Sequence, residues 1–254
     1  MNSTLLADNS EASLKKFLNT LSAVDEVGAK ARVEMLATRS IKTSSKNWAI
    51  DLAIRMVDLT TLEGADTPGK VKALCAKGVY PDPTDLTVPS VGAICVYNDM
   101  VKIARQALDT GGGKNIPVAA VSTAFPSGRA SMEVKIKDTR DAIANGATEI
   151  DMVIDRGAFL AGKLGFVFDQ IKAIKEVCGD KVHLKVILET GELVTLDNVR
   201  KASYLAMLAG ADFIKTSTGK VAPAATTPVV YVMLEAVRDY YKLTGNRIGV
   251  KPAG

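Results

Sequence analysis

A short apolar segment, Asp212–Thr216, carries a lysine, Lys215, where a buried strand would normally place an apolar side chain. Burying an ammonium group is costly unless it is paired or loses its proton. A deprotonated lysine is a nucleophile for a carbonyl carbon. The segment continues as Ser217–Lys220, whose backbone N–H groups, hydroxyls and charge suit a phosphate. For this segment alone, the competing interpretation is a lysine near a strand end that extends into solvent.

Three more ionisable residues lie in or at the ends of apolar segments: Asp151, Lys185 and Lys251. Asp151 and Lys215 each follow a helix-ending glycine by five residues, whereas Lys185 and Lys251 follow one by six. Inward side chains of a barrel form layers contributed by alternate strands. The spacing therefore predicts one layer with Asp151 and Lys215, and an adjacent layer with Lys185 and Lys251.

Such a cluster has a definite chemical use. Like charges and desolvation lower the pKa of at least one of three neighbouring lysines. The resulting neutral amine can form a Schiff base with an aldehyde, and Asp151 can carry protons, directly or through water. This predicts a metal-free aldolase without a cofactor, and the alternative is a structural network of ion pairs, which also perturbs pKa values.

The elements that would position these residues alternate along the chain. Apolar segments that predict strands are Ile54–Leu59, Val91–Tyr97, Ile116–Ala124, Glu149–Ile154, His183–Leu188, Asp212–Thr216 and Arg247–Lys251. Helical patterns lie between most of them, at Met132–Asn145, Gly165–Cys178, Leu196–Leu208 and Pro228–Leu243. This alternation predicts a parallel sheet built from βαβ units. A TIM (β/α)8 barrel is favoured over a doubly wound sheet, because no GxGxxG motif follows the first predicted strand.

Composition excludes several classes of function. The net charge of +4 comes from basic residues scattered among 28 acidic ones, which is not a nucleic-acid-binding pattern. Three cysteines without CxxC spacing and a single histidine argue against a structural metal site and a Ser-His-Asp triad. No apolar segment approaches the roughly 20 residues that span a bilayer. We therefore expect a cytoplasmic protein that binds neither nucleic acid nor membrane.

The sequence also predicts a division of the chain. Residues 1–45 are polar and contain one predicted helix, Glu11–Leu21, so they are expected to form an N-terminal helical extension. Residues 46–254 would form the barrel domain, truncated after its seventh strand because the eighth strand and its helix are missing. The oligomeric state is left open, with a homo-oligomer as one alternative.

Several segments resemble one enzyme family, 2-deoxyribose-5-phosphate aldolase, in order from about residue 50 onwards. They are Val57–Leu62, Ala93–Tyr97, Glu149–Val153, Glu189–Leu193, Phe213–Lys220 and Val250–Gly254. The combination of FIKTSTGK with a later KPAG is highly specific. The resemblance implies a class I aldolase on a TIM barrel, which reversibly cleaves a small phosphorylated sugar, 2-deoxy-D-ribose 5-phosphate, to D-glyceraldehyde 3-phosphate and acetaldehyde.

The resemblance also implies roles for individual residues. Lys215 matches the Schiff-base lysine, Lys251 the lysine that lowers its pKa, and Asp151 the proton-relay acid. The matches in the substrate and phosphate site are Thr218, Gly219, Lys220, Gly254, Asp58, Thr60, Cys95 and Lys185. The family's motif continues after KPAG with further phosphate-binding residues that this sequence does not contain. The alternatives are a transaldolase-like Schiff-base enzyme and a non-catalytic scaffold on a decayed barrel.

Overall fold

The computed structural model describes residue 6 and residues 8–254, which form two compact units. The large unit comprises the described residues up to 38 together with residues 123–136 and 152–254. The small unit comprises residues 39–122 and 137–151. Along the described residues, seven strands, β1 to β7, alternate with helices. The predicted alternation of strands and helices is therefore confirmed.

The bounds of the elements follow in order along the chain. The helices are α1 (Glu11–Leu18), α2 (Glu26–Ala37), α3 (Thr43–Arg55), α4 (Pro68–Val79), α5 (Val101–Thr110), α6 (Met132–Ala144), α7 (Arg156–Leu160), α8 (Leu164–Cys178), α9 (Leu196–Leu208) and α10 (Thr227–Thr244). The strands are β1 (Asp58–Thr60), β2 (Ala93–Tyr97), β3 (Val118–Ser122), β4 (Glu149–Val153), β5 (His183–Ile187), β6 (Phe213–Lys215) and β7 (Gly249–Lys251). Two short 3₁₀ turns are η1 (Asn98–Met100) and η2 (Thr190–Glu192).

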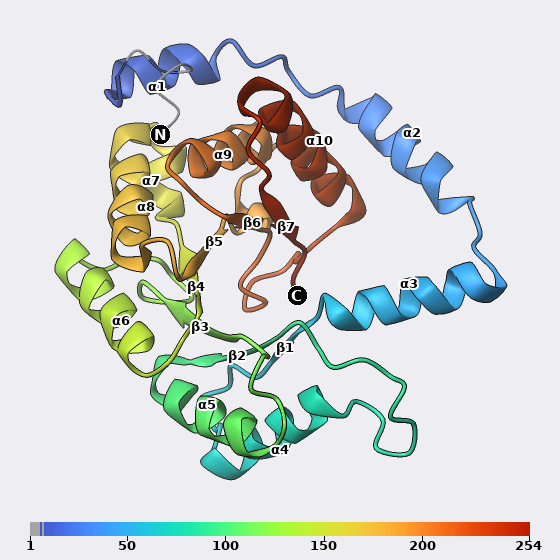
Figure 1. Ribbon diagram of the computed structural model, residues 1–254. Helices are drawn as coiled ribbons and strands as arrows, with labels where there is room; N and C mark the ends of the chain where they lie inside the picture. The colour runs from blue at the N-terminus through green and yellow to red at the C-terminus, as the bar shows by residue number, and fades with distance from the viewer. Residues whose placement is uncertain (1–5, 7) are drawn as a thin grey trace. The chain divides into compact units, whose positions relative to one another are not determined.

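In the small unit, β1 pairs with β2 and β2 with β3, both in parallel. All five residues of β3 are buried, and so are the first four of β2. Strands buried on both faces are typical of parallel sheets whose connections are helices, because helices then cover the faces. Here α4 and α5 pack on one another and on β2 (Figure 1).

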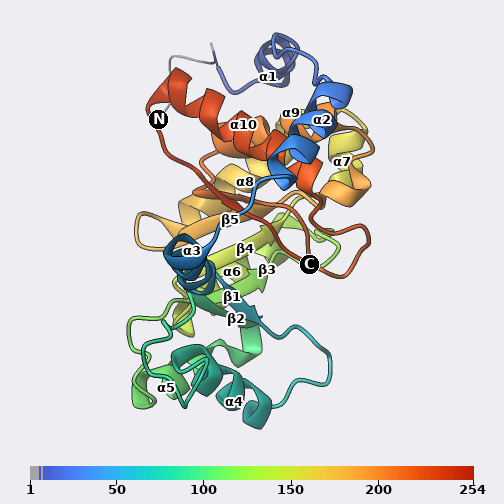
Figure 2. The same cartoon turned by 90° about the vertical axis from the view of Figure 1, so that its right-hand side faces the viewer.

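In the large unit, β5, β6 and β7 pair in parallel, and α9 and α10 lie side by side next to β6 and β7 (Figure 1). The rings of Tyr204 and Tyr240 meet edge to face at 6.2 Å between the two helices, and the Tyr240 hydroxyl donates to the carbonyl of Met207 at 3.2 Å. Helix α2 packs on α10 (Figure 2). The helix before β6 and the helix before β7 end at glycines with positive φ, Gly210 and Gly245, as the sequence predicts.

The start of the first strand was predicted wrongly. The apolar residue Ile54 belongs to α3, and β1 begins only at Asp58. Good helix formers such as Ala49, Leu52 and Ala53 precede it, so the apolar segment continues a helix before it becomes a strand.

The N-terminal part contains more helix than the one predicted segment. Helix α1 is confirmed, and its cap Ser10 accepts from the N–H of Ser13 at 3.2 Å. Helix α2 was not predicted, and α3 passes through position 45. Residues 1–5 and 7 of the predicted extension lie outside the described residues, and the division into an extension and a barrel domain stays a prediction. Within the described part of the chain, no helix is both long enough and apolar enough to cross a membrane.

Candidate active site

The large unit holds three lysines on one face of three neighbouring strands. Lys215 of β6 is the register partner of Lys251 of β7, while Lys185 of β5 pairs with Phe213, two residues before Lys215. Register partners in a parallel sheet, and residues two apart along a strand, project to the same face. Lys185 and Lys215 are buried, with 2% and 6% of their surface exposed, and Lys251 is partly buried. The structure therefore places the predicted nucleophile directly beside Lys251.

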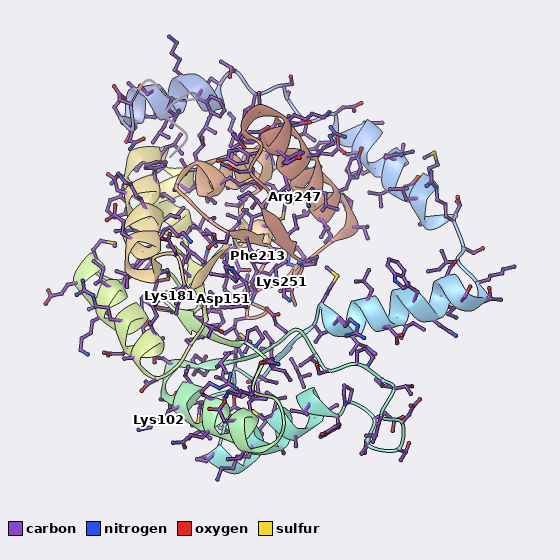
Figure 3. The ribbon with its side chains drawn as sticks, viewed as in Figure 1. Lys102, Asp151, Lys181, Phe213, Arg247 and Lys251 are labelled. Atoms are coloured by element: carbon purple, nitrogen blue, oxygen red, sulfur yellow. The ribbon has the colours of Figure 1, made fainter. Side chains whose placement is uncertain are left out.

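Two residues before Lys215 and Lys251 in their strands, Phe213 lies over its register partner Gly249 on the same face. A Cβ atom added to Gly249 would come within 2.1 Å of Phe213 Cδ1, so only glycine leaves room for the ring at this register position. The ring of His183 meets Phe213 nearly edge-on at 6.1 Å. Phe213 and Lys251 come from neighbouring strands, as Figure 3 shows.

The turn after Lys215 is built from Thr218, Gly219 and Lys220. The Thr218 backbone N–H donates to Oε1 of Glu189 at 3.1 Å, and its hydroxyl donates to Oε2 of the same carboxylate at 2.5 Å. The Thr218 hydroxyl oxygen in turn accepts the Lys220 N–H at 3.1 Å. Gly219 has a φ of +77°, which favours glycine. Gly219 and Lys220 are exposed, whereas Thr218 and Glu189 are buried.

The segment that follows β7 supports this turn from the other side. The Ala253 N–H donates to the Thr216 hydroxyl at 2.9 Å, and the Ala225 N–H donates to the Ala253 carbonyl at 3.1 Å. A Cβ atom on Gly219 would lie 3.8 Å from the Cα of Gly254. The predicted residues Thr218, Gly219, Lys220 and Gly254 therefore come from two loops at the carboxyl ends of β6 and β7. That end of the strands is where TIM-barrel enzymes place their active sites.

Two buried hydroxyls next to this turn have no hydrogen-bond partner among the described residues: Ser217 Oγ and Thr190 Oγ1. Buried polar atoms are nearly always satisfied by protein, ligand or ordered water. Thr190 lies in the loop after β5 and Ser217 in the loop after β6. The Thr190 N–H donates to the Thr216 carbonyl at 2.9 Å. These two hydroxyls could therefore form hydrogen bonds with a bound molecule.

The small unit holds four more of the predicted residues. Asp58 and Thr60 lie two residues apart on β1, and Thr60 pairs with Cys95 of β2, so these three share one face. Cys95 and Asp151 of β4 are fully buried. The Thr60 hydroxyl donates to the Asp58 carbonyl at 2.7 Å. Asp58, Thr60 and Cys95 are thus brought together.

Three other buried titratable residues of the described chain are Cys75, Cys178 and Lys135. Burial raises the pKa of the Cys75 thiol to about 11 and that of the Cys178 thiol to about 12, so neither is a nucleophile near neutral pH. Lys135 of α6 is fully buried, and its Nζ donates to Gln170 Oε1 of α8 at 2.8 Å. Burial lowers the pKa of Lys135, and the charge of Asp155 opposes this shift.

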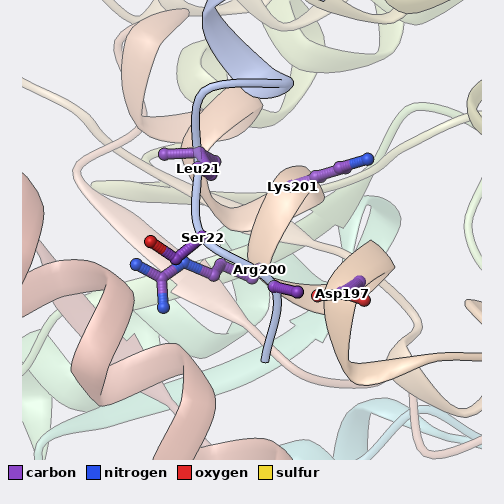
Figure 4. A pocket seen from close by; sticks show the side chains of 6 residues that line it. Leu21, Ser22, Asp197, Arg200 and Lys201 are labelled. Carbon is purple, nitrogen blue, oxygen red and sulfur yellow. The ribbon is translucent and has the colours of Figure 1, made fainter. Parts of the chain in front are cut away.

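A pocket of about 100 Å³ lies under the segment between α1 and α2 (Figure 4). Its walls are Leu21, Ser22, Ala23, Asp197, Arg200 and Lys201. None of the predicted site residues lines it. The Asp197 carboxylate accepts the Val24 N–H at 2.7 Å, so this region fastens the N-terminal segment to α9.

Comparison with known proteins identifies the relationship. The model of the DeoC/LacD family of aldolases matches residues 52–254. The chain belongs to the DeoC/LacD family of aldolases. It is 45% identical to human deoxyribose-phosphate aldolase over 234 residues, which covers 88% of this chain and 72% of the human protein. Mouse deoxyribose-phosphate aldolase is 44% identical over 229 residues, covering 87% of this chain and 71% of its own length.

Solved aldolase structures share the fold. A Coccidioides immitis protein classed provisionally as a deoxyribose-phosphate aldolase superposes with a TM-score of 0.70 at 27% identity, over 91% of this chain and 86% of its own. The aldolase QR15 gives a TM-score of 0.63 at 31% identity, over 78% and 80% of the two chains. The predicted fold class, a TIM-barrel-like α/β protein, is confirmed. As a member of this aldolase family, the chain is a lyase.

One residue of the site was not predicted from the sequence. The matching family motif contains Glu189 without a role for it, yet its carboxylate accepts two hydrogen bonds from Thr218. Its signal was an ionisable residue directly after the apolar segment Val186–Leu188, which is the same kind of signal that drew attention to Lys215.

Proposed function

We propose that this chain is a class I aldolase that reversibly cleaves 2-deoxy-D-ribose 5-phosphate to D-glyceraldehyde 3-phosphate and acetaldehyde, in deoxyribonucleotide catabolism. The observation that carries the proposal is the register pairing of Lys215 with Lys251 in an aldolase-family chain. Membership of the family and the names of the human and mouse relatives support the choice of substrate. A cytoplasmic location and a homo-oligomeric state stay predictions.

In the proposed reaction, the neutral amine of Lys215 attacks the C1 aldehyde of the open-chain sugar. Loss of water from the carbinolamine gives a protonated imine. Removal of the C3 hydroxyl proton then breaks the C2–C3 bond, and the bonding electrons move into the imine to form an enamine. The C3 fragment leaves as D-glyceraldehyde 3-phosphate. Protonation of the enamine at C2 and hydrolysis of the imine release acetaldehyde and restore the lysine.

The remaining residues have distinct proposed roles. Lys251 lies beside Lys215 in the sheet, and a second positive charge there favours the neutral form of Lys215. Asp151 carries protons to and from the reacting carbons, directly or through water. The turn Thr218–Lys220, together with Gly254, forms the site for the phosphate end of the sugar, and Asp58, Thr60, Cys95 and Lys185 line its pocket.

The test is to trap the imine. The chain is incubated with acetaldehyde, reduced with borohydride, and analysed by intact mass and peptide mapping. We expect a two-carbon adduct on Lys215. Lys215→Met, which keeps an unbranched side chain of similar size, should give no adduct. Lys242→Met, which changes an exposed lysine on α10, should react like the unchanged protein.

Two results would contradict the proposal. One is a folded chain, by circular dichroism, that forms no adduct and does not cleave the sugar phosphate, which would favour the scaffold alternative. The other is an adduct that persists in Lys215→Met at a different lysine, which would reassign the nucleophile. Turnover of a ketose phosphate in place of 2-deoxyribose 5-phosphate would favour the transaldolase-like alternative.

A further inference from the structure

We propose that Glu189 is a positioning residue, whose buried carboxylate holds the Thr218–Lys220 turn in the conformation that receives the substrate's phosphate. This inference rests on the proposed function and extends it to a residue of the loop after β5. Glu189 is fully buried, and both of its carboxylate oxygens accept hydrogen bonds from Thr218. A buried carboxylate is tolerated only where such bonds replace water.

The direction of the hydrogen bonds limits what Thr218 can do. Its hydroxyl has one proton, which is donated to Glu189, and its oxygen accepts the Lys220 N–H. A threonine hydroxyl has only one proton to donate. The Thr218 hydroxyl therefore has no proton left for a phosphate oxygen. Thr218 contributes by linking Glu189 to the Lys220 backbone, and the exposed Gly219 and Lys220 make the contact with the anion.

The backbone around Glu189 is consistent with a supporting role. Glu189 has a left-handed φ of +52°, which is unusual for a residue other than glycine. This conformation starts the tight turn η2, in which Gly191 approaches the loop after β6 so closely that a Cβ atom would lie 2.3 Å from the Pro223 carbonyl oxygen. The loop after β5 thus contacts the loop after β6 through Glu189 with Thr218, Thr190 with Thr216, and Gly191 with Pro223. Among the described residues, the buried hydroxyls of Thr190 and Ser217 have no hydrogen-bond partner, so this region has polar groups for a ligand.

The decisive variant is Glu189→Gln. A glutamine keeps the volume and one acceptor oxygen. Its amide N–H group would face the Thr218 hydroxyl, which is also a donor there, so this hydrogen bond would be lost. We expect the KM for 2-deoxyribose 5-phosphate and the Kd for inorganic phosphate to rise about tenfold, the scale of one hydrogen bond to a charged group. Trapping of acetaldehyde on Lys215 should change less than twofold, because acetaldehyde has no phosphate. Glu176→Gln, at an exposed glutamate of α8, is the matched control and should change none of these values.

A double-mutant cycle separates positioning from general damage. If Glu189 acts through Thr218, then Thr218→Val should raise the same KM. Adding Glu189→Gln to it should raise the KM by less than Glu189→Gln does alone, because only the bond from the Thr218 N–H remains. Fully additive effects, an unchanged phosphate Kd, or a parallel loss of acetaldehyde trapping would overturn the proposal. Should Glu189→Gln fail to fold, Thr218→Val alone decides, and an unchanged phosphate Kd in that variant would overturn it.

The phosphate measurement also distinguishes this inference from the proposed function. A chain that binds phosphate but does not cleave the sugar phosphate would refute the aldolase assignment, while the Kd values would still test Glu189. A chain that cleaves the sugar phosphate with an unchanged KM in Glu189→Gln would refute only the role of Glu189.

Discussion

Gly249→Ala is expected to destabilise the strand pair that carries both lysines. The new Cβ atom would lie 2.1 Å from Cδ1 and 2.2 Å from Cε1 of the Phe213 ring. Carbon atoms pack at about 3.5–4.0 Å, so the ring or the strand must move by more than about 1 Å. Overpacking of this kind costs about 1–3 kcal/mol. For a chain of this size, a loss of about 2 kcal/mol lowers the Tm by about 4–8 °C.

The same change should affect the chemistry. Gly249 is the register partner of Phe213, and Lys251 lies two residues further along β7. A shift of β7 away from β6 therefore moves Lys251 relative to Lys215, and we expect slower trapping of acetaldehyde. The assays are thermal unfolding by circular dichroism and the rate of adduct formation. Gly64→Ala is the matched control, because its added Cβ meets no atom within 4 Å.

A second substitution tests whether the Phe213 ring causes the destabilisation expected for Gly249→Ala. In a Phe213→Ala background the ring is absent, so adding Gly249→Ala should no longer cost stability. An unchanged Tm for Gly249→Ala would refute the steric argument. An equal loss of stability in both backgrounds would refute it as well, since the cost would then not come from the Phe213 ring.

Three further predictions concern ionisation. Lys251→Met removes the positive charge beside Lys215, so the pKa of Lys215 should rise and the trapping profile should move to higher pH; an unmoved profile excludes this role. Burial lowers the pKa of Lys135 in the folded chain, so between that lowered pKa and about 10.5, the pKa of an unfolded lysine, the unfolded chain binds more protons. The free energy of unfolding should therefore rise with pH over this range. In urea unfolding, Lys135→Met should not show this rise. Equal slopes of the free energy of unfolding against pH in the two proteins would contradict the prediction. With its pKa raised to about 12, Cys178 should resist iodoacetamide at pH 8 in the folded chain and react in urea, as read by mass spectrometry.

The sequence predicted the strands that carry the three lysines better than it predicted the helices α2 and α3. Segments with an ionisable residue in an apolar setting, such as the one around Lys215, are short and bounded by helix-ending glycines. Their type and approximate position were therefore readable. By contrast, α2 buries only Ala29, so its residues give no apolar stripe that would distinguish a helix from a loop. Helix α3 buries none of its residues, so no apolar stripe marks it as a helix, and Ile54 resembles the start of a strand.

Contacts between loops could not be predicted in the same way. The pairing of Lys215 with Lys251 depends on register, which spacing from a glycine approximates only where strands begin alike. The bonds from Glu189 to Thr218 connect two loops 29 residues apart, and no periodic pattern reports on them. The burial of Lys135 against Gln170 was equally hidden, because a lysine within a helix usually lies on its solvent face.

The hydrogen bonds between Thr216 and Ala253 have a consequence for the order in which the site assembles. During synthesis, the segments around Glu189 and Thr218 are available before β7, whereas Ala253 follows it. The loop after β6 can therefore be anchored on the Glu189 side while its other side is still open. At that stage the chain has the nucleophile and part of the phosphate-binding turn, but neither Lys251 beside Lys215 nor the contact between Gly219 and Gly254. The segment Lys251–Gly254 therefore completes both parts of the site, because it carries the lysine beside Lys215 and the residues that contact the loop after β6.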